Sequence, residues 1–157
     1  MFSTGDKIAY PMHGAGIIEG IEEKKILGEV RQYYILRVPY GDMKIMIPVG
    51  NSEEIGVRAI ISRDELREVL AVLSGESTSM PSNWNRRNRE NLEKLKTGDL
   101  FQVAAVIRNL VRIDREKRLS TGEKKMLNSA RQILISEMVL VTGMNAEQAE
   151  EEVLSRI

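Results

Sequence analysis

The spacing of apolar residues changes once along this chain, near Ser62, and that change decides the class of fold. Before Ser62, apolar and polar residues alternate over short stretches separated by turn residues, which is typical of β-strands. After Ser62, apolar residues recur every three to four positions, which is typical of helices. The sequence therefore predicts an α+β protein with a β domain over residues 1–60 and an all-α domain over residues 61–157.

Five short strands are expected in the first domain, and the tight turns between them indicate a small β-barrel. The turns carry the residues Pro-Met-His-Gly, Leu-Gly-Glu, Tyr-Gly-Asp and Pro-Val-Gly-Asn. Edge strands of such a sheet can pair with a strand of another protein. The strands are predicted at residues 7–10, 15–23, 32–38, 43–47 and 55–57.

Five helices are expected in the second domain, because helix start signals recur there at short intervals. Capping boxes lie at residues 62–65 and 120–123, and a variant of the same pattern lies at 145–148. Ser82 and Asp99 are expected to cap the other two helices. The helices are predicted at residues 62–73, 83–96, 99–117, 120–141 and 145–156.

The composition favours a soluble globular protein. Of the 157 residues, 42% are apolar, which is enough for a hydrophobic core, and there is no Cys, so disulfides and thiolate metal sites are excluded. No apolar run approaches the roughly 18 residues of a membrane span, and the start of the chain lacks a signal-peptide pattern. We therefore expect a cytoplasmic monomer that does not bind membranes.

No enzyme site is visible in the sequence. His13, the only histidine, lies in a turn far along the chain from any paired acid and nucleophile. The segment 14–16, Gly-Ala-Gly, lacks the third glycine of a dinucleotide-binding loop. The acidic cluster at 150–152 lacks the alternate spacing and turn glycine of a calcium loop. The sequence predicts no catalytic residue, no metal and no cofactor.

The formal net charge of zero hides a strong asymmetry along the chain. Residues 83–131 contain 13 Lys and Arg against 6 Asp and Glu, a net charge of +7. Residues 1–82 contain 9 basic and 12 acidic residues, and residues 132–157 contain 1 and 5. A block of +7 favours a polyanionic partner, although a solvated charged surface is the commoner cause of such a block.

Two polar rows with i, i+4, i+7 spacing flank the predicted core of the helical domain. They can face an anionic partner, or they can snorkel and pair with nearby carboxylates, and the spacing leaves both interpretations open. The rows are Arg108, Arg112 and Arg115 on one helix and Lys124, Asn128 and Arg131 on the next.

The single tryptophan, Trp84, lies among cations and amides in the first turn of the helix predicted at 83–96. Its neighbours on the helix surface are Arg87, Asn88 and Asn91, none of which covers an indole ring. Tryptophan is mostly buried in proteins, so another element could cover it. Alternatively, an apolar side chain beside arginines can insert as a wedge into the minor groove of DNA.

Three segments in this order resemble the CarD and CdnL family of bacterial transcription regulators. They are GDKIAYPMHG at 5–14, NWNRR at 83–87, and LSTGEKKML with ARQIL between 119 and 134. The resemblance spans essentially the whole chain. It implies a Tudor-like, SH3-like barrel that binds the lobe of the RNA polymerase β subunit, as in transcription-repair coupling factors, and a helical domain that contacts promoter DNA.

The resemblance also implies roles for individual residues. Trp84 would be a wedge in the minor groove at the upstream edge of the transcription bubble, where it would stabilise the open promoter complex. Arg86, Arg89 and Lys124 would hold backbone phosphates, with Arg87 as a weaker candidate. Such contacts position a protein on DNA without reading its sequence.

On the polymerase side, the family uses two basic positions of the barrel. One matches Lys24, but the other falls on Met46, which carries no charge. Either Lys44 supplies the missing cation, or docking depends on main-chain pairing and apolar contact. The alternative function is a general nucleic-acid-binding module, or an adaptor unconnected with RNA polymerase, because SH3-like barrels serve many functions.

Overall fold

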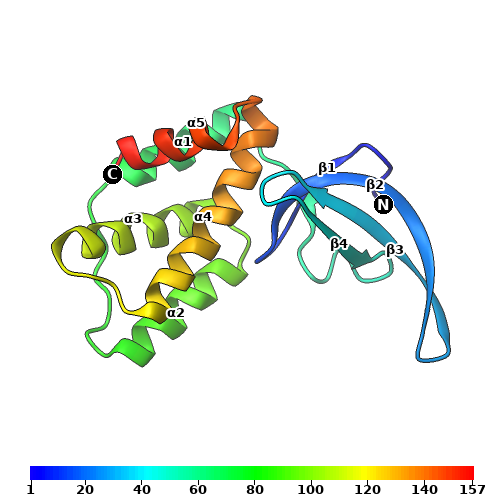
Figure 1. Cartoon of the computed structure of the whole chain (residues 1–157), viewed down its shortest axis with the longest axis horizontal. Helices are drawn as coiled ribbons and strands as arrows, with labels where there is room; N and C mark the ends of the chain where they lie inside the picture. The colour runs from blue at the N-terminus through cyan, green and yellow to red at the C-terminus, as the bar shows by residue number, and fades with distance from the viewer.

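The structure is a computed structural model that describes residues 1–157, and it divides into a sheet and a helical bundle (Figure 1). The fold class is confirmed: a Tudor-like β domain precedes an all-α domain. The strands are β1 (Lys7–Tyr10), β2 (Gly14–Ile26), β3 (Glu29–Val38), β4 (Met43–Pro48) and β5 (Arg58–Ala59). The helices are α1 (Arg63–Ser74), α2 (Trp84–Lys96), α3 (Leu100–Glu116), α4 (Thr121–Thr142) and α5 (Ala146–Ser155).

The sheet is antiparallel, with the strand order β4-β3-β2-β1-β5, so β4 and β5 are its edges. Its core is a cluster of seven buried side chains. On β3, the buried residues Tyr34, Leu36 and Val38 alternate with more exposed ones, as the period of a strand requires. The first four strands therefore include the residues predicted for them, within one residue at the ends that lie next to the core.

Two strand predictions need correction. The strand predicted at 55–57 is wrong: residues 51–56 form turns, Gly56 has a φ of 87°, and the fifth strand begins at Arg58. The hairpin of β2 and β3 is also longer than predicted. Every residue from 21 to 32 is exposed, so the alternation of apolar and polar residues that reveals a half-buried strand is missing there.

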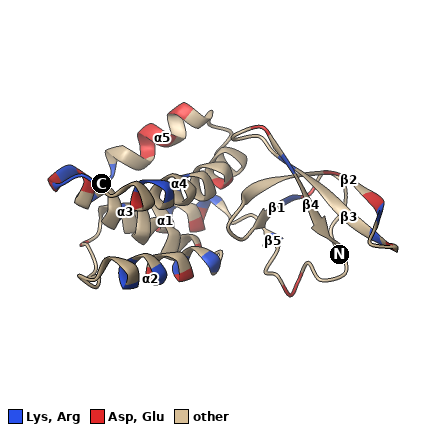
Figure 2. Cartoon of the chain, turned by 60° about the horizontal axis from the view of Figure 1, so that its bottom comes forward, with Lys and Arg blue, Asp and Glu red and all other residues tan.

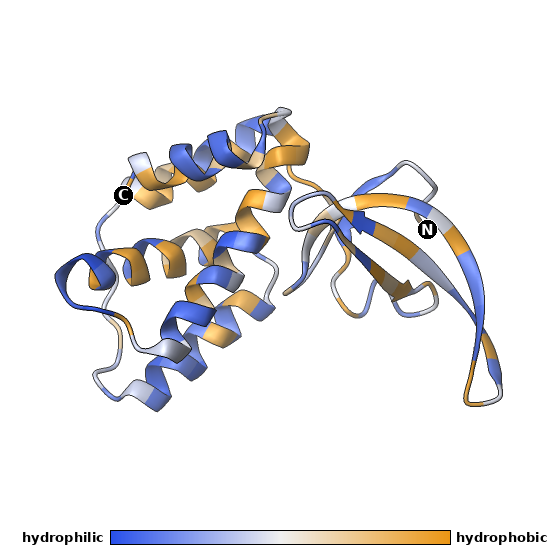
Figure 3. Ribbon diagram, viewed as in Figure 1, coloured by the Kyte–Doolittle hydropathy of each residue, from blue (hydrophilic) through white to orange (hydrophobic).

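The five helices pack around a core of 21 buried residues, and their apolar faces turn inward (Figure 3). Ser62, Asp99, Ser120 and Asn145 each accept a backbone N–H at the start of a helix, as predicted. The cap predicted at Ser82 is wrong, because the neighbouring Asn83 accepts the N–H of Arg86 at 3.0 Å. No helix is both long enough and apolar enough to cross a membrane.

The middle of α4 joins the two domains. The Ser136 hydroxyl accepts the N–H of Ala15 at 2.8 Å, across 121 positions of sequence. The Arg58 guanidinium donates to both oxygens of Glu137, at 2.8 and 3.0 Å, and the same carboxylate accepts the N–H of Ile61 at 2.9 Å. Glu137 is only 1% exposed. These buried polar contacts hold the sheet in a fixed orientation on the helical domain.

Candidate nucleic-acid interface and docking face

Trp84 is the first residue of α2 and contacts Ser120, the cap of α4. The starts of these two helices lie close together in Figure 1. Its indole N–H donates to the Ser120 hydroxyl at 2.9 Å. The ring lies against Gly122, where an added Cβ would be 3.2 Å from Cζ2 of the indole. Trp84 nevertheless remains 45% exposed. The ring is therefore neither a core residue nor a free one, because α4 covers part of it and the rest faces solvent.

A buried ion pair between α2 and α4 supports this arrangement. Arg87 donates to the two oxygens of Glu123 at 2.9 and 3.0 Å, and the two side chains are 15% and 4% exposed. The Ser120 hydroxyl also contacts Glu123, at 3.2 Å. A continuous network thus runs from the indole of Trp84 through Ser120 to Glu123 and Arg87.

The ionisation of Glu123 follows from these neighbours. Burial by itself would raise the pKa of Glu123. The hydrogen bonds and charge of Arg87, together with the hydrogen bonds of Ser120, outweigh burial and hold that pKa below its ordinary value. The carboxylate therefore stays charged at neutral pH and keeps the guanidinium of Arg87 occupied.

The other predicted phosphate contacts are open to solvent. Arg86 and Arg89 lie on α2, facing away from α4, since helical spacing places them opposite Trp84 and Arg87. Arg86 makes only an exposed pair with Glu90, at 3.4 Å. Arg89 forms no ion pair, and neither does Lys124 in the first turns of α4. Basic residues recur along the exposed side of α2 in Figure 2.

The first polar row has a structural role. Arg108 is 4% exposed and donates to the carbonyl of Val72 at 2.9 Å, while Arg112 donates to the carbonyl of Leu73 at 3.3 Å. Arg115 donates to the carbonyl of the last residue at 2.9 Å. Burial, and then the nearby charge of Arg112, lower the pKa of Arg108. These arginines hold the end of α1 and the end of the chain, which favours the structural interpretation of this row, and the buried Arg108 is not available to a partner.

Two residues of the site were not predicted from the sequence as partners of the tryptophan. The sequence pattern indicates only a helix cap at Ser120 and no role for Gly122. A glycine in the first turn of a helix can mark a close approach by another group, and that signal would have pointed to Gly122. Lys125, one turn further along α4 than Gly122, is exposed and forms no ion pair, and it adds a cation to the start of this helix.

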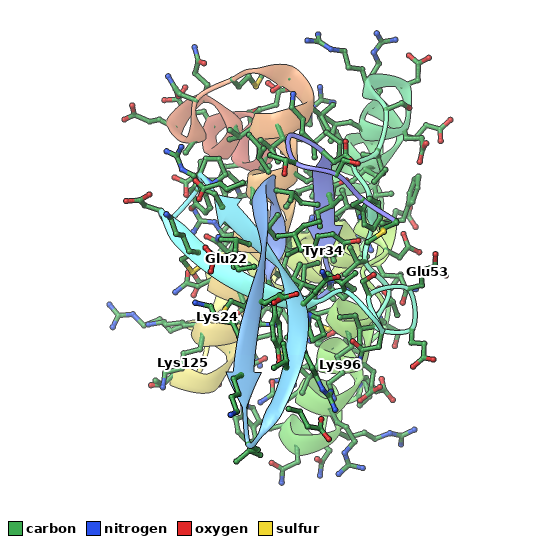
Figure 4. The ribbon with its side chains drawn as sticks, turned by 90° about the vertical axis from the view of Figure 1, so that its right-hand side faces the viewer. Glu22, Lys24, Tyr34, Glu53, Lys96 and Lys125 are labelled. Atoms are coloured by element: carbon green, nitrogen blue, oxygen red, sulfur yellow. The ribbon has the colours of Figure 1, made fainter.

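The predicted polymerase-binding residues share one face of the sheet. Lys24, Lys44 and Met46 line a hollow of about 460 Å³ on the outer face of β2, β3 and β4. Lys24 pairs with Glu22 at 3.2 Å, and the two lie side by side on β2 in Figure 4. Lys44 pairs with Glu19 at 3.2 Å. Met46 is 40% exposed. It is an apolar residue in the same hollow as these two ion pairs.

Other chemistry is sparse. The ring of His13 stacks on Tyr10 with 4.3 Å between the ring centroids, in the turn after β1. No group of three or more His, Asp or Glu side chains is placed where it could hold a metal ion.

Comparison with known proteins identifies the class. Residues 2–61 match the CarD-like/TRCF RID domain, and residues 68–154 match the CarD C-terminal domain. The chain is 39% identical over 148 residues to YdeB of Bacillus subtilis (strain 168), named as a candidate transcription factor; the match covers 94% of this chain and 97% of that protein. A RID domain joined to this helical domain defines a transcription regulator. The chain belongs to the CarD family of such regulators.

Proposed function

We propose that this regulator binds the β subunit of RNA polymerase through the outer face of β2–β4 and stabilises the open promoter complex with Trp84. In this proposal, the indole enters the minor groove at the upstream edge of the bubble. The observation that carries the proposal is the half-exposed ring, which Ser120 and Gly122 hold in one orientation. A ring fixed before binding loses less conformational entropy when it meets DNA.

The proposed mechanism is a shift of equilibrium. A ligand shifts an equilibrium only by its difference in affinity for the two states. Unstacking a base step costs a few kcal/mol, and an aromatic ring that fills the opened step offsets part of that cost. The regulator would therefore favour melted promoter DNA over closed duplex, and promoters would differ through the energy of melting. This activity belongs in the cytoplasm, with the polymerase.

The cations around the ring would position it on the DNA. Arg86 makes only an exposed pair with Glu90, and Arg89 on α2 and Lys124 on α4 make no ion pair, so exposed positive charge lies on both helices that meet at Trp84. We assign these three residues to backbone phosphates, which fix register without reading sequence. Arg87 has its guanidinium bonded to Glu123, and we assign it the role of holding α2 against α4.

The docking face is tested with the substitution Lys24→Glu. It replaces the pair with Glu22 by two adjacent carboxylates, and we expect affinity for core RNA polymerase to fall about tenfold, because like charges at an interface are costly. Binding of the chain to DNA should be unchanged. Lys25→Glu is the matched control, since successive strand residues point to opposite faces of a sheet.

Quantitative pull-down with core polymerase measures both variants. Equal affinity for the wild type and Lys24→Glu would refute the docking face. Absence of polymerase binding by the wild-type chain would favour the general nucleic-acid-binding module instead.

The position of the ring is tested with Gly122→Ala. Alanine is the better helix former, by up to about 1 kcal/mol, so thermal stability should be unchanged or higher. The new Cβ would lie 3.2 Å from Cζ2 of Trp84, and the ring must tilt toward its solvent side to make room. We therefore expect a shorter open-complex lifetime from a protein that is no less stable. Thr121→Ala, in the same turn, is the control, and equal lifetimes for all three proteins would show that the ring's orientation does not matter.

A further inference from the structure

The tip of the β2–β3 hairpin carries exposed apolar side chains. Leu27 is 99% exposed, Val30 63% and Ile26 47%. The hairpin projects from the body of the molecule, and apolar residues lie at its tip (Figures 1 and 3). Folding leaves Leu27 almost fully exposed and Ile26 and Val30 about half exposed or more, and none of the three belongs to a hydrophobic core.

The backbone at the tip makes leucine an unfavourable choice. Ile26 pairs with Glu29, which leaves Leu27 and Gly28 as a two-residue turn. Their φ angles are 52° and 82°, so both residues adopt the left-handed conformation. Such a turn favours Asn-Gly, whereas a leucine in this conformation is sterically strained. Strain at a fully exposed residue is a reason to look for a function there.

The tip continues the proposed docking face. Met46 pairs with Ile35 and Ile35 with Gly20, so by alternation Lys24 and Ile26 point to the same side as Met46. The charges along this side are already neutralised within the chain: Lys24 pairs with Glu22 at 3.2 Å, and Arg31 with Glu29 at 2.6 Å. The groups left without partners are apolar.

We infer that Leu27 inserts into an apolar hollow on the RNA polymerase β subunit, beside the contacts of Lys24 and Met46. This inference rests on the proposed function, because it names a further contact of the same docking face. It also accounts for a face with an uncharged Met46 at its centre: apolar burial at the tip supplies affinity where the chain lacks a second cation.

The test is Leu27→Asn in the full chain, with affinity for core polymerase and melting temperature as readouts. Asn-Gly suits the turn, so the melting temperature should be unchanged or higher. Affinity for polymerase should fall about tenfold or more, as expected for losing the burial of a leucine side chain. Leu154→Asn is the matched control, because Leu154 is an exposed leucine, 39% accessible, on α5 and far along the chain from the docking face.

The possible outcomes distinguish a failure of the Leu27 contact from a failure of the proposed docking face. Equal affinity of the wild type and Leu27→Asn overturns the inference, and if Lys24→Glu still loses binding, the proposed docking face survives. Loss of self-association on sedimentation, with polymerase affinity intact, would make the tip a contact between copies of this chain and also overturns the inference. A wild-type chain that does not bind polymerase removes both the tip contact and the proposed function.

Discussion

Replacing Arg87 with alanine is expected to destabilise the protein by about 3 to 5 kcal/mol, because removing one partner of a buried ion pair leaves the other charge uncompensated. Glu123 is 4% exposed and loses both hydrogen bonds from the guanidinium. Arg86→Ala is the matched control. Arg86 is the adjacent arginine, its only ion pair is exposed, and its loss should cost at most about 1 kcal/mol.

The cost of Arg87→Ala should depend on pH. In the wild type the pKa of Glu123 lies below its ordinary value of 4.5, so the pair stabilises the fold above that pH and the stabilisation is lost as the pH falls through the lowered pKa. Without Arg87, only the hydrogen bonds of Ser120 oppose burial, so the pKa of Glu123 rises from its value in the wild type, and the variant is penalised at neutral pH and relieved in acid. The difference in unfolding free energy should therefore narrow toward pH 4.

Denaturant unfolding at pH 7 and near pH 4 measures this difference. Two results would contradict the role given to the ion pair. One is an equal loss of unfolding free energy in Arg86→Ala and Arg87→Ala, and the other is a difference between these variants that is the same at pH 7 and near pH 4.

Replacing Trp84 with alanine is expected to shorten the lifetime of the open promoter complex about tenfold, since an aromatic ring stacked on a base contributes about 1 to 3 kcal/mol. The substitution also frees the Ser120 hydroxyl, but Ser120 keeps its bond from the N–H of Glu123 and still caps α4. Binding to polymerase should be retained, because the docking face lies on the other domain.

The lifetime is measured by challenging preformed open complexes with a competitor. Trp84→Phe keeps a ring without the indole N–H and should fall between the wild type and alanine. Lifetimes that match in the wild type and Trp84→Ala, with polymerase binding intact, would remove the wedge from the proposed function.

The fold was largely predictable because burial on one face leaves a period in the sequence. The alternation of apolar and polar residues identified β1, the parts of β2 and β3 next to the core, and most of β4. Four of the five helix caps were also predicted correctly. The cap of α2 failed because Ser82 and Asn83 are adjacent and equally suited to the position. The outer part of the β2–β3 hairpin was not predicted, because both of its faces are exposed and its sequence lacks the alternation of apolar and polar residues.

The site was predictable only in part, since spacing on one helix does not show which element covers it. The environment of Trp84 depends on Ser120 and Gly122, which lie 36 and 38 positions away in sequence. Likewise, Arg108 looked like part of a cationic face, but it reaches back to the end of α1. By contrast, strand alternation places Lys44 and Met46 on one face, the resemblance adds Lys24, and the three residues line one hollow.

The most direct measurement is crosslinking from position 84 in a complex of the full chain, RNA polymerase and promoter DNA. A photoreactive aromatic residue in place of Trp84 should form crosslinks to DNA at the upstream edge of the bubble, and these should depend on polymerase. Crosslinks to protein alone, or to DNA distributed along the duplex, would contradict the placement of the indole at the fork.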